Sequence, residues 1–268
     1  MTFTLGPRAA SSGYRLEAFD EIGSTNVEAM ERGRAGDRGS IWFVTTMQTA
    51  GRGRRQRAWI APRGNLASSV LEVLSIAPST AATLGFAAGL AIAAALQKVS
   101  IEAALRAGPQ ALRYDLKWPN DVLVGGRKLV GISLDAEIVD DRLAIVVGIG
   151  TNIVGAPQGT PTPAISLADL GVQISAEELF SALSDSWVEF RGIWDNGRGF
   201  GEIRRLWLER AANLGQPIAI TSSGSTIEGI FETIDAQGCL MVRTASGQLL
   251  PITAGDVFFG TAASARSA

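Results

Sequence analysis

The sequence lacks histidine and has a single cysteine, Cys239, among its 268 residues. One cysteine excludes an intramolecular disulfide and a cysteine-rich zinc site. The absence of histidine removes the commonest metal ligand and the commonest general base. Any catalysis must therefore rely on lysine, arginine, carboxylates, the backbone or a bound cofactor metal.

Long hydrophobic runs and a strong net charge are also missing. The longest nearly unbroken apolar run, residues 84–96, is too short for a membrane span, and the N-terminus lacks the apolar core of a signal peptide. The formal net charge is −2, and 46% of the residues are hydrophobic. We expect a soluble, cytoplasmic protein of one or two globular domains with a sizeable buried core.

Hydrophobic periodicity and turn residues predict the order of the elements. The expected elements are strands at residues 14–22, 41–47 and 65–74, a helix over 79–106, a strand over 111–118, hairpins turning at 125–128 and 139–142, and helices near 175–195 and 199–213. Consecutive hairpins indicate a mixed or antiparallel sheet, because alternating strands and helices would be needed for a parallel one.

The sequence pattern changes after Gly215, which indicates a second domain. Short strands separated by glycine- and serine-containing turns predict a small barrel there. We therefore predict an α+β fold in which helices pack against a mixed sheet in residues 1–215, followed by the barrel in residues 216–260. Residues 261–268 are expected to be a disordered tail.

A basic loop lies between two expected strands. Residues 50–65 contain glycines at 51, 53 and 64, arginines at 52, 54, 55, 57 and 63, and no acidic residue. Glycine allows the backbone to approach a ligand closely, and guanidinium groups suit phosphate or carboxylate. A solvated basic loop is an equally good interpretation of the composition. An arm for nucleic acid is disfavoured, because the basic charge is confined to this stretch.

The stretch LKWPNDVLV at residues 116–124 offers a second candidate site. Pro119 disfavours a helical conformation at Trp118, so Lys117 is expected at the fixed end of a strand. A lysine in such a position can neutralise charge at a transferring phosphoryl group. Taken alone, Lys117 fits an exposed lysine on a strand better than a catalytic one.

Two other polar stretches have a structural and a functional interpretation. Gly148 and Gly150 follow an expected strand, but Ile153 stands where a dinucleotide-binding fingerprint needs a third glycine, so we reject that fingerprint. Ser24 or Thr25 can cap a helix, and together with Asn26 they could instead hydrogen-bond a compact polar ligand.

Taken in this order, these stretches resemble the biotin protein ligases over roughly residues 18–258. The motifs that carry the resemblance are Ser-Thr-Asn at 24–26, the glycine-arginine loop at 51–57, Lys-Trp-Pro-Asn-Asp at 117–121, Lys-Leu-x-Gly-Ile at 128–132 and Gly-x-Gly-x-Asn at 148–152. The resemblance implies a class II synthetase-like biotin/lipoate ligase fold with a C-terminal SH3-like barrel.

The resemblance also implies a two-step reaction with ATP, Mg²⁺ and biotin. The biotin carboxylate attacks the α-phosphate of MgATP to give biotinyl-5′-AMP and diphosphate. A lysine of a biotin carboxyl carrier protein, a subunit or domain of acetyl-CoA carboxylase, then accepts the biotinyl group and releases AMP. This chemistry depends on charge neutralisation and exclusion of water more than on a histidine base.

Roles for individual residues follow from the same resemblance. The implied catalytic residues are Lys117 and Arg54. The implied biotin contacts are Ser24, Thr25, Asn26, Gln48, Arg52, Gly53, Arg54 and Lys117. The implied ATP contacts are Arg52, Arg54, Lys117 and Asn152. The implied lining of the cavity consists of Gly51, Trp59, Gly131 and Ile132. Metal ligands are not assigned.

The loop departs from the family at one position, because Gln56 stands where the family usually has a third glycine. If that backbone needs a positive φ, glutamine would strain the closed loop and alter retention of the adenylate. We expect residues 51–57 to be mobile without ligand and ordered with biotinyl-adenylate. Only about 20 residues precede Ser24, so we expect a ligase without repressor function. Monomer and homodimer both remain open.

Two other functions are considered. A lipoate or octanoate transfer enzyme would share the scaffold and the strand-end lysine, but the Ser-Thr-Asn motif and the glycine-arginine loop followed by Trp59 favour biotin. A nucleic-acid-binding regulator would use the arginine loop on phosphates, with steep salt dependence. The acidic remainder of the chain argues against that function, and no nucleic-acid or membrane partner is expected.

Overall fold

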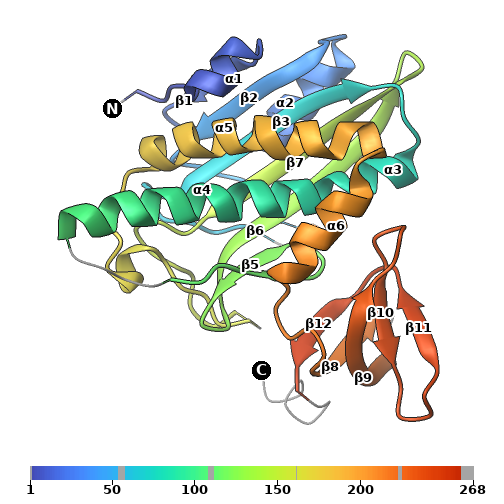
Figure 1. Ribbon diagram of the computed structural model, residues 1–268. Coiled ribbons are helices and arrows are strands. Elements are labelled where there is room, and N and C mark those ends of the chain that lie inside the picture. The colour runs from blue at the N-terminus through green and yellow to red at the C-terminus, as the bar shows by residue number, and fades with distance from the viewer. Residues whose placement is uncertain (1, 54–57, 108–111, 161, 223–224, 261–268) are drawn as a thin grey trace.

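The computed structural model of the protein describes residues 2–53, 58–107, 112–160, 162–222 and 225–260. A seven-stranded sheet with helices on both faces forms the larger part, and a five-stranded sheet follows it in sequence (Figure 1). The α+β fold with a mixed sheet is thereby confirmed.

The larger sheet has the strand order β1-β2-β3-β7-β6-β5-β4. Its strands are β1 (Arg15–Phe19), β2 (Gly39–Thr45), β3 (Leu66–Leu74), β4 (Asp115–Lys117), β5 (Asp121–Val124), β6 (Arg127–Val139) and β7 (Arg142–Thr151). Strands β1 and β2 pair in parallel, whereas the other neighbours pair antiparallel. The two predicted hairpins are β5–β6 and β6–β7.

Helices cover the two faces of this sheet unequally. They are α1 (Pro7–Ser11), α2 (Thr25–Arg34), α3 (Pro78–Ala82), α4 (Leu84–Ala107), α5 (Ala176–Trp194) and α6 (Phe200–Glu209), with short 3₁₀ turns η2 (Ala168–Leu170) and η3 (Asp195–Gly197). Helices α4 and α5 lie side by side across one face, and α2 lies on the other (Figure 1). Alternate residues of the central strands therefore belong to two separate apolar clusters, one under each layer of helices.

The long apolar helix confirms one prediction and adjusts its boundary. By length and composition alone, residues Pro78–Leu105 could cross a membrane, but 72% of their most apolar window is buried inside the protein. The expected single helix is interrupted at Thr83, which separates α3 from α4. The Thr83 hydroxyl donates to the Thr80 carbonyl oxygen and accepts a 2.8 Å hydrogen bond from Trp194 Nε1, so side-chain bonds compete with helical geometry there.

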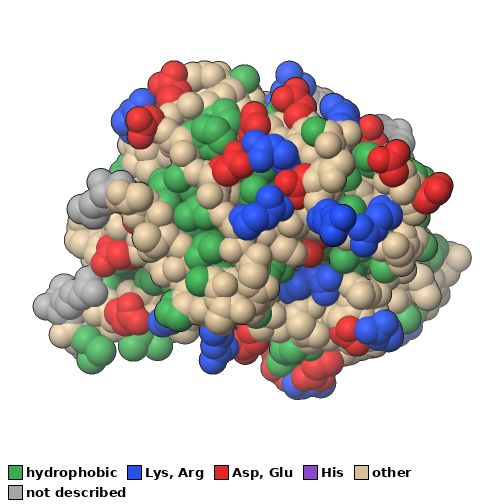
Figure 2. Space-filling model, turned by 90° about the horizontal axis from the view of Figure 1, so that it is seen from above, with side chains coloured by type: hydrophobic (Ala, Val, Ile, Leu, Met, Phe, Trp, Pro, Cys, Tyr) green, Lys and Arg blue, Asp and Glu red, His purple; other side chains and the backbone are tan. Residues whose placement is uncertain are grey.

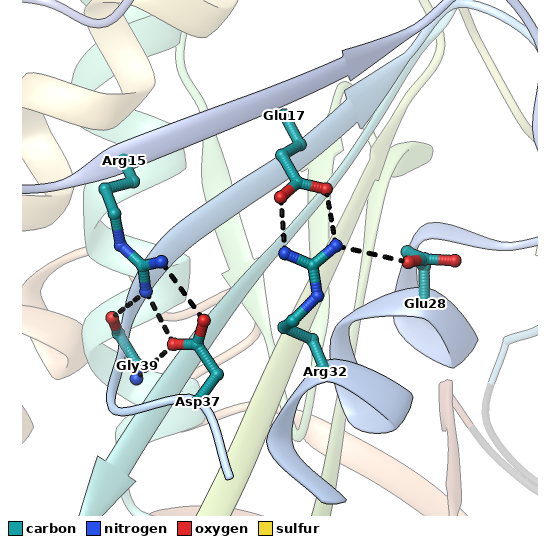
Figure 3. Close-up of polar contacts among 6 residues, drawn as sticks. All are labelled: Arg15, Glu17, Glu28, Arg32, Asp37 and Gly39. Carbon is teal, nitrogen blue, oxygen red and sulfur yellow. Dashed lines mark hydrogen bonds and ion pairs between the residues drawn. The ribbon is translucent and has the colours of Figure 1, made fainter. Parts of the chain in front are cut away.

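Ion pairs fasten α2 to the edge of the sheet (Figure 3). Arg32 binds both carboxylate oxygens of Glu17 on β1 and lies 3.7 Å from Glu28. Arg15 binds Asp37, which in turn accepts a hydrogen bond from the Gly39 N–H. Pairing of this kind places basic and acidic side chains next to one another on the face drawn in Figure 2. The pairs fix the helix whose first turn carries Thr25 and Asn26.

The second sheet is antiparallel and has the order β11-β10-β9-β8-β12. Its strands are β8 (Pro217–Ser222), β9 (Ser225–Ile234), β10 (Leu240–Arg243), β11 (Leu249–Ile252) and β12 (Asp256–Phe259). This arrangement fits the expected SH3-like barrel. Trp118 Nε1 donates a 3.1 Å hydrogen bond to the Gly238 carbonyl oxygen and joins the two parts. The domain boundary near residue 215 stays a prediction, and the tail 261–268 lies outside the described residues.

Candidate active site

A cavity of about 440 Å³ opens on the α2 face of the larger sheet. Two rows of small residues run across strands β3, β7 and β6 beneath it. Ser69, Gly148 and Ser133 are paired neighbours in one row. Ala67, Gly150 and Gly131 form the next row. Because side chains alternate along a strand, both rows face the same side as the apolar residues under α2.

The glycines of this floor are required by what lies on them. A Cβ on Gly150 would stand 2.6 Å from the Trp59 indole, and one on Gly131 would stand 2.8 Å from the same ring. A Cβ on Gly148 would stand 2.0 Å from Asn26 Oδ1. Contacts this short do not occur, so the absence of side chains lets Trp59 and Asn26 approach the sheet.

For the reaction that the family resemblance implies, Gly150→Ala is expected to displace Trp59 and to lower kcat/KM for biotin by roughly tenfold to a hundredfold, the loss typical of misplaced binding groups. Steady-state measurement of ATP–diphosphate exchange checks this value. Gly201→Ala on α6 is the control, because a Cβ there meets nothing within 4 Å. Equal kcat/KM in both variants would contradict the packing of Trp59 on the floor.

Gln48 caps the helix that carries the Ser-Thr-Asn motif. Ser24 occupies the N-cap position of α2, but its side chain makes no capping bond within the described part of the chain. Gln48 Oε1 instead accepts hydrogen bonds from the Thr25 N–H at 2.8 Å and from Thr25 Oγ1 at 3.1 Å. With its oxygen engaged, Gln48 keeps its amide N–H groups for a ligand in the cavity.

A chain of hydrogen bonds continues from Thr25 across the sheet. Ser69 Oγ lies 2.7 Å from Thr25 Oγ1 and 2.6 Å from Asn26 Oδ1. Asn26 Nδ2 donates to Ser133 Oγ at 3.0 Å and to Asp135 Oδ2 at 2.8 Å. Thr25, Asn26, Gln48 and Ser133 all line the cavity. One end of the cavity is thus polar and, apart from Asp135 behind it, uncharged.

Lys117 and Lys128 both line the same cavity. Lys128 on β6 makes a 2.7 Å ion pair with Asp121 and lies 5.5 Å from the centre of the Trp59 ring. A Cβ on Gly131 would stand 3.2 Å from Lys128 Nζ, so this ammonium group lies over the glycine floor. Two cations suit a ligand that carries a carboxylate and phosphates.

Lys117 ends β4, as the sequence predicts, and is only 8% exposed. Its Nζ donates to Thr162 Oγ1 at 3.2 Å and lies 5.3 Å from the centre of the Phe259 ring of β12. Burial is the main reason that the pKa of Lys117 lies below its usual value; the nearby Asp121 carboxylate offsets part of this decrease. Within the described residues Lys117 makes no direct ion pair, and a buried lysine in this state is prepared to receive an anion.

Asn152 follows β7 and presents an unused acceptor. Its Nδ2 donates to the Ile165 carbonyl oxygen at 3.2 Å, which fixes the orientation of the amide. Within the described residues, the buried Oδ1 has no hydrogen-bond partner. An unpaired buried carbonyl is costly, so a ligand donor in the cavity is the natural partner.

Asn65 holds the chain that leaves β7 directly after the cavity residue Asn152, and sequence patterns gave it no role. Its Oδ1 accepts from the N–H groups of Ile153 at 2.8 Å and Val154 at 2.9 Å, and its Nδ2 donates to the Gly155 carbonyl oxygen at 2.7 Å. Asn65 is 2% exposed. The Asn65 side chain therefore pairs the backbone groups of residues 153–155, as a neighbouring strand would. Without it, these buried groups would lack hydrogen-bond partners.

Asn65→Ala is expected to lower the free energy of unfolding by about 2 to 4 kcal/mol, because it leaves several buried backbone groups without partners. Urea denaturation measures this change. Asn65→Asp keeps the acceptor but sets a buried carboxylate oxygen against the Gly155 carbonyl oxygen, so it should be destabilising as well. Unchanged stability of the alanine variant would contradict the anchoring role.

The residues predicted from the sequence are placed as follows. Those that line the cavity are Thr25, Asn26, Gln48, Arg52, Gly53, Trp59, Lys117, Gly131, Ile132 and Asn152. Ser24 and Gly51 lie behind it; the Gly51 carbonyl oxygen accepts a 2.9 Å hydrogen bond from the Trp59 N–H. Arg54 and Gln56 lie outside the described residues. The expected mobility of residues 51–57 therefore stays a prediction.

Several cavity residues were not assigned roles from the sequence. They are Asp121, Lys128, Ser133, Thr162 and Asp256. Ser69 also had no role, and it holds the lining residues Thr25 and Asn26 without lining the cavity itself. Asp121 and Lys128 belong to recognised motifs and could have been assigned from them. The others depend on strand register or on the approach of β12 to the cavity, which no local pattern contains.

Comparison with known proteins follows the same division of the chain. Residues 23–152 match the model of the Biotin/lipoate A/B protein ligase family, and residues 214–260 match the Biotin protein ligase C terminal domain. The chain is 38% identical to a biotin–[acetyl-CoA-carboxylase] ligase of Paracoccus denitrificans, covering 88% of this chain and 97% of that protein. The corresponding ligase of Mycobacterium tuberculosis is 34% identical, with 92% and 90% covered. The biotin protein ligase of Aquifex aeolicus in complex with biotin and ATP shares the fold, with a TM-score of 0.74, 22% identity, and 92% and 99% covered.

Proposed function

We propose the following reaction for this chain, which belongs to the biotin protein ligase family. The protein is an ATP-dependent ligase that activates biotin as biotinyl-5′-AMP and transfers the biotinyl group to a lysine of a biotin carboxyl carrier protein. The biotin carboxylate oxygen attacks the α-phosphorus and diphosphate leaves. The carrier amine then attacks the acyl carbon and AMP leaves.

One observation supports this reaction above all others. A single cavity joins an uncharged polar end, made by Gln48, Thr25 and Ser133, to a cationic end made by Lys128 and Lys117. Biotin has the matching asymmetry, with a neutral ureido ring at one end and a carboxylate at the other. Lys128 and Ser133 are five residues apart on β6, roughly 16 Å at about 3.3 Å per residue. The Lys128 side chain reaches along the strand, so its Nζ lies over Gly131, between these two residues.

The two lysines divide the anionic groups between them in this proposal. Lys128 lies over the floor next to Trp59 and binds the biotin carboxylate. Lys117 lies deeper, beside Thr162 and Phe259, and faces the α-phosphate. Their charges oppose the negative charge that builds up at the pentavalent phosphorus. Arg52, Gly53 and Arg54 are proposed to cover the adenylate, as the family resemblance implies.

Asn152 is proposed to bind the adenine amino group through Oδ1. The 6-amino group of adenine can donate a hydrogen bond to the Asn152 carbonyl oxygen. Guanine has a carbonyl oxygen at the same ring position, which cannot donate. Diphosphate exchange should therefore be at least roughly a hundredfold more efficient with ATP than with GTP, because a site built to accept one hydrogen bond rejects an analogue that lacks the donor. Asn152→Ala should reduce this preference. Equal preference in both proteins would contradict the assignment.

Mg²⁺ fits the cavity only together with a nucleotide. Within the described residues no group of three or more Asp, Glu, His or Cys side chains could hold a metal. The Asp121 and Asp256 carboxylates line the cavity. Mg²⁺ commonly binds through one or two carboxylates and substrate phosphates, so these residues are proposed to hold it. The ion supplies charge neutralisation on the phosphates.

Transfer to the carrier tests the function. The purified protein, biotin, MgATP and a biotin carboxyl carrier domain are expected to yield a carrier heavier by one biotinyl group, as measured by mass spectrometry. A carrier whose target lysine is replaced by arginine is the control. Modification with lipoate or octanoate but not biotin would support the alternative transferase. Cytoplasmic location and the choice between monomer and homodimer remain predictions.

A further inference from the structure

Ser133 lies at the polar end of the cavity, in the row formed with Gly148 and Ser69. The Asn26 amide lies over Gly148 and bridges the two serines of this row. Neither the motifs in the sequence nor the family resemblance assigns Ser133 a role. Its contacts determine which hydrogen bonds it can still form.

The orientation of the Asn26 amide is set by its neighbours. The Asp135 carboxylate can only accept, so Asn26 must direct Nδ2 toward it, at 2.8 Å. The Asn26 oxygen then faces Ser69 Oγ at 2.6 Å. The two protons of Nδ2 are used by Asp135 and Ser133. Asn26 therefore has no N–H left for a ligand, whereas its oxygen keeps a second lone pair, so its assignment as a biotin contact stays a prediction for an N–H of the ligand.

The same bonds leave one donor directed to the cavity. Ser133 Oγ accepts the 3.0 Å hydrogen bond from Asn26, so a lone pair is occupied while its own proton is uncommitted. Among the described residues, no acceptor for the Ser133 hydroxyl proton is found. A cavity-lining hydroxyl in this state is a donor for a ligand carbonyl.

We propose that the Ser133 hydroxyl donates a hydrogen bond to the ureido carbonyl oxygen of biotin and selects for it. Asn26, fixed by Asp135 and Ser69, orients Ser133 for this bond. This inference rests on the proposed function and adds a residue that recognises one atom of the substrate. The oxygen of a cyclic urea is a strong acceptor, whereas lipoate and octanoate have no polar atom to place there.

Steady-state ATP–diphosphate exchange tests the proposal with biotin and with the analogue in which sulfur replaces the ureido oxygen. Sulfur is the weaker acceptor, so the wild-type protein should prefer biotin. Ser133→Ala should raise KM for biotin roughly tenfold, with kcat nearly unchanged, and should lose most of that preference. Ser133→Thr keeps the hydroxyl and should retain the preference.

Ser100→Ala is the matched control, because Ser100 lies on α4, away from the cavity, and its buried hydroxyl bonds to Tyr114. It should change neither KM nor the preference. If Ser133→Ala leaves KM unchanged, or raises it equally for biotin and the sulfur analogue, Ser133 does not bind the ureido oxygen. Absence of any exchange by the wild-type protein with biotin would instead overturn the proposed function, and the inference with it.

Discussion

Lys128→Met is expected to slow biotinyl-adenylate formation by roughly a hundredfold to a thousandfold, the loss typical when one preorganised charge is removed from a transition state. Lys128 lies over the glycine floor and beside Trp59, where the proposed carboxylate is placed. Both KM for biotin and kcat should change, because the charge holds the nucleophile before and during attack. Single-turnover formation of the adenylate, followed with radiolabelled ATP, measures the effect.

Two further variants separate the role of the charge from its ion pair. Lys128→Met leaves Asp121 without its partner, and an uncompensated buried carboxylate could disturb the fold. The double variant with Asp121→Asn removes both charges and restores the charge balance of the fold; because Asp121 is also proposed to hold Mg²⁺, this variant should be at least as slow as Lys128→Met. Lys98→Met, at an exposed lysine on α4, should behave as the wild type. Near-normal turnover of Lys128→Met would contradict its placement against the biotin carboxylate.

Lys117→Met is expected to slow the same step roughly a hundredfold, but through ATP instead of biotin. Its surroundings place it at the phosphate side, so KM for ATP and kcat should change while KM for biotin stays nearly constant. Measuring both KM values in diphosphate exchange distinguishes it from Lys128. A rise in KM for biotin alone would reverse the proposed division between the two lysines.

The lowered pKa of Lys117 adds a pH dependence to this prediction. As the pH rises through that pKa, Lys117 loses its charge, so wild-type kcat/KM should fall at a pH below the usual lysine range. Lys117→Arg keeps its charge and should shift this alkaline limit upward, even if its rate is lower. An alkaline limit at the same pH in both proteins would show that another group sets it.

As the pH rises through the pKa of Lys117, the free energy of unfolding should rise while kcat/KM falls. Because the folded-state pKa of Lys117 lies below its unfolded value, the unfolded chain binds more protons between the two pKa values. Stability therefore rises as the pH rises through that window, and the cost of the buried charge is fully present below it. Lys117→Met removes this cost, so its thermal midpoint at pH 7 should not fall below that of the wild type.

Sequence patterns were sufficient for the fold because each element carries its own periodicity. The hairpins at β5–β6 and β6–β7 were signalled by their turn residues, and the buried helix α4 by its alanine-rich run. The interruption at Thr83 was not foreseen, because it depends on Trp194 from a distant helix. Local patterns cannot contain such contacts.

The site was predicted only in part, because some of its contacts join residues that are distant in the sequence. The family resemblance assigned roles to Gln48, Lys117 and Asn152, which all line the cavity. The capping of α2 by Gln48 in place of the Ser24 side chain required the tertiary structure. The row of Ser69, Gly148 and Ser133 required the register of three strands.

The central claim is that this cavity activates biotin, with its ring at the polar end and its carboxylate at the lysines. ATP–diphosphate exchange measured in parallel with biotin, lipoate and octanoate tests it most directly. We expect exchange that depends on biotin, with lipoate and octanoate at least roughly a hundredfold less efficient in kcat/KM, because their apolar ends would leave the polar groups of the cavity unpaired. Exchange driven by lipoate or octanoate as efficiently as by biotin would contradict the claim.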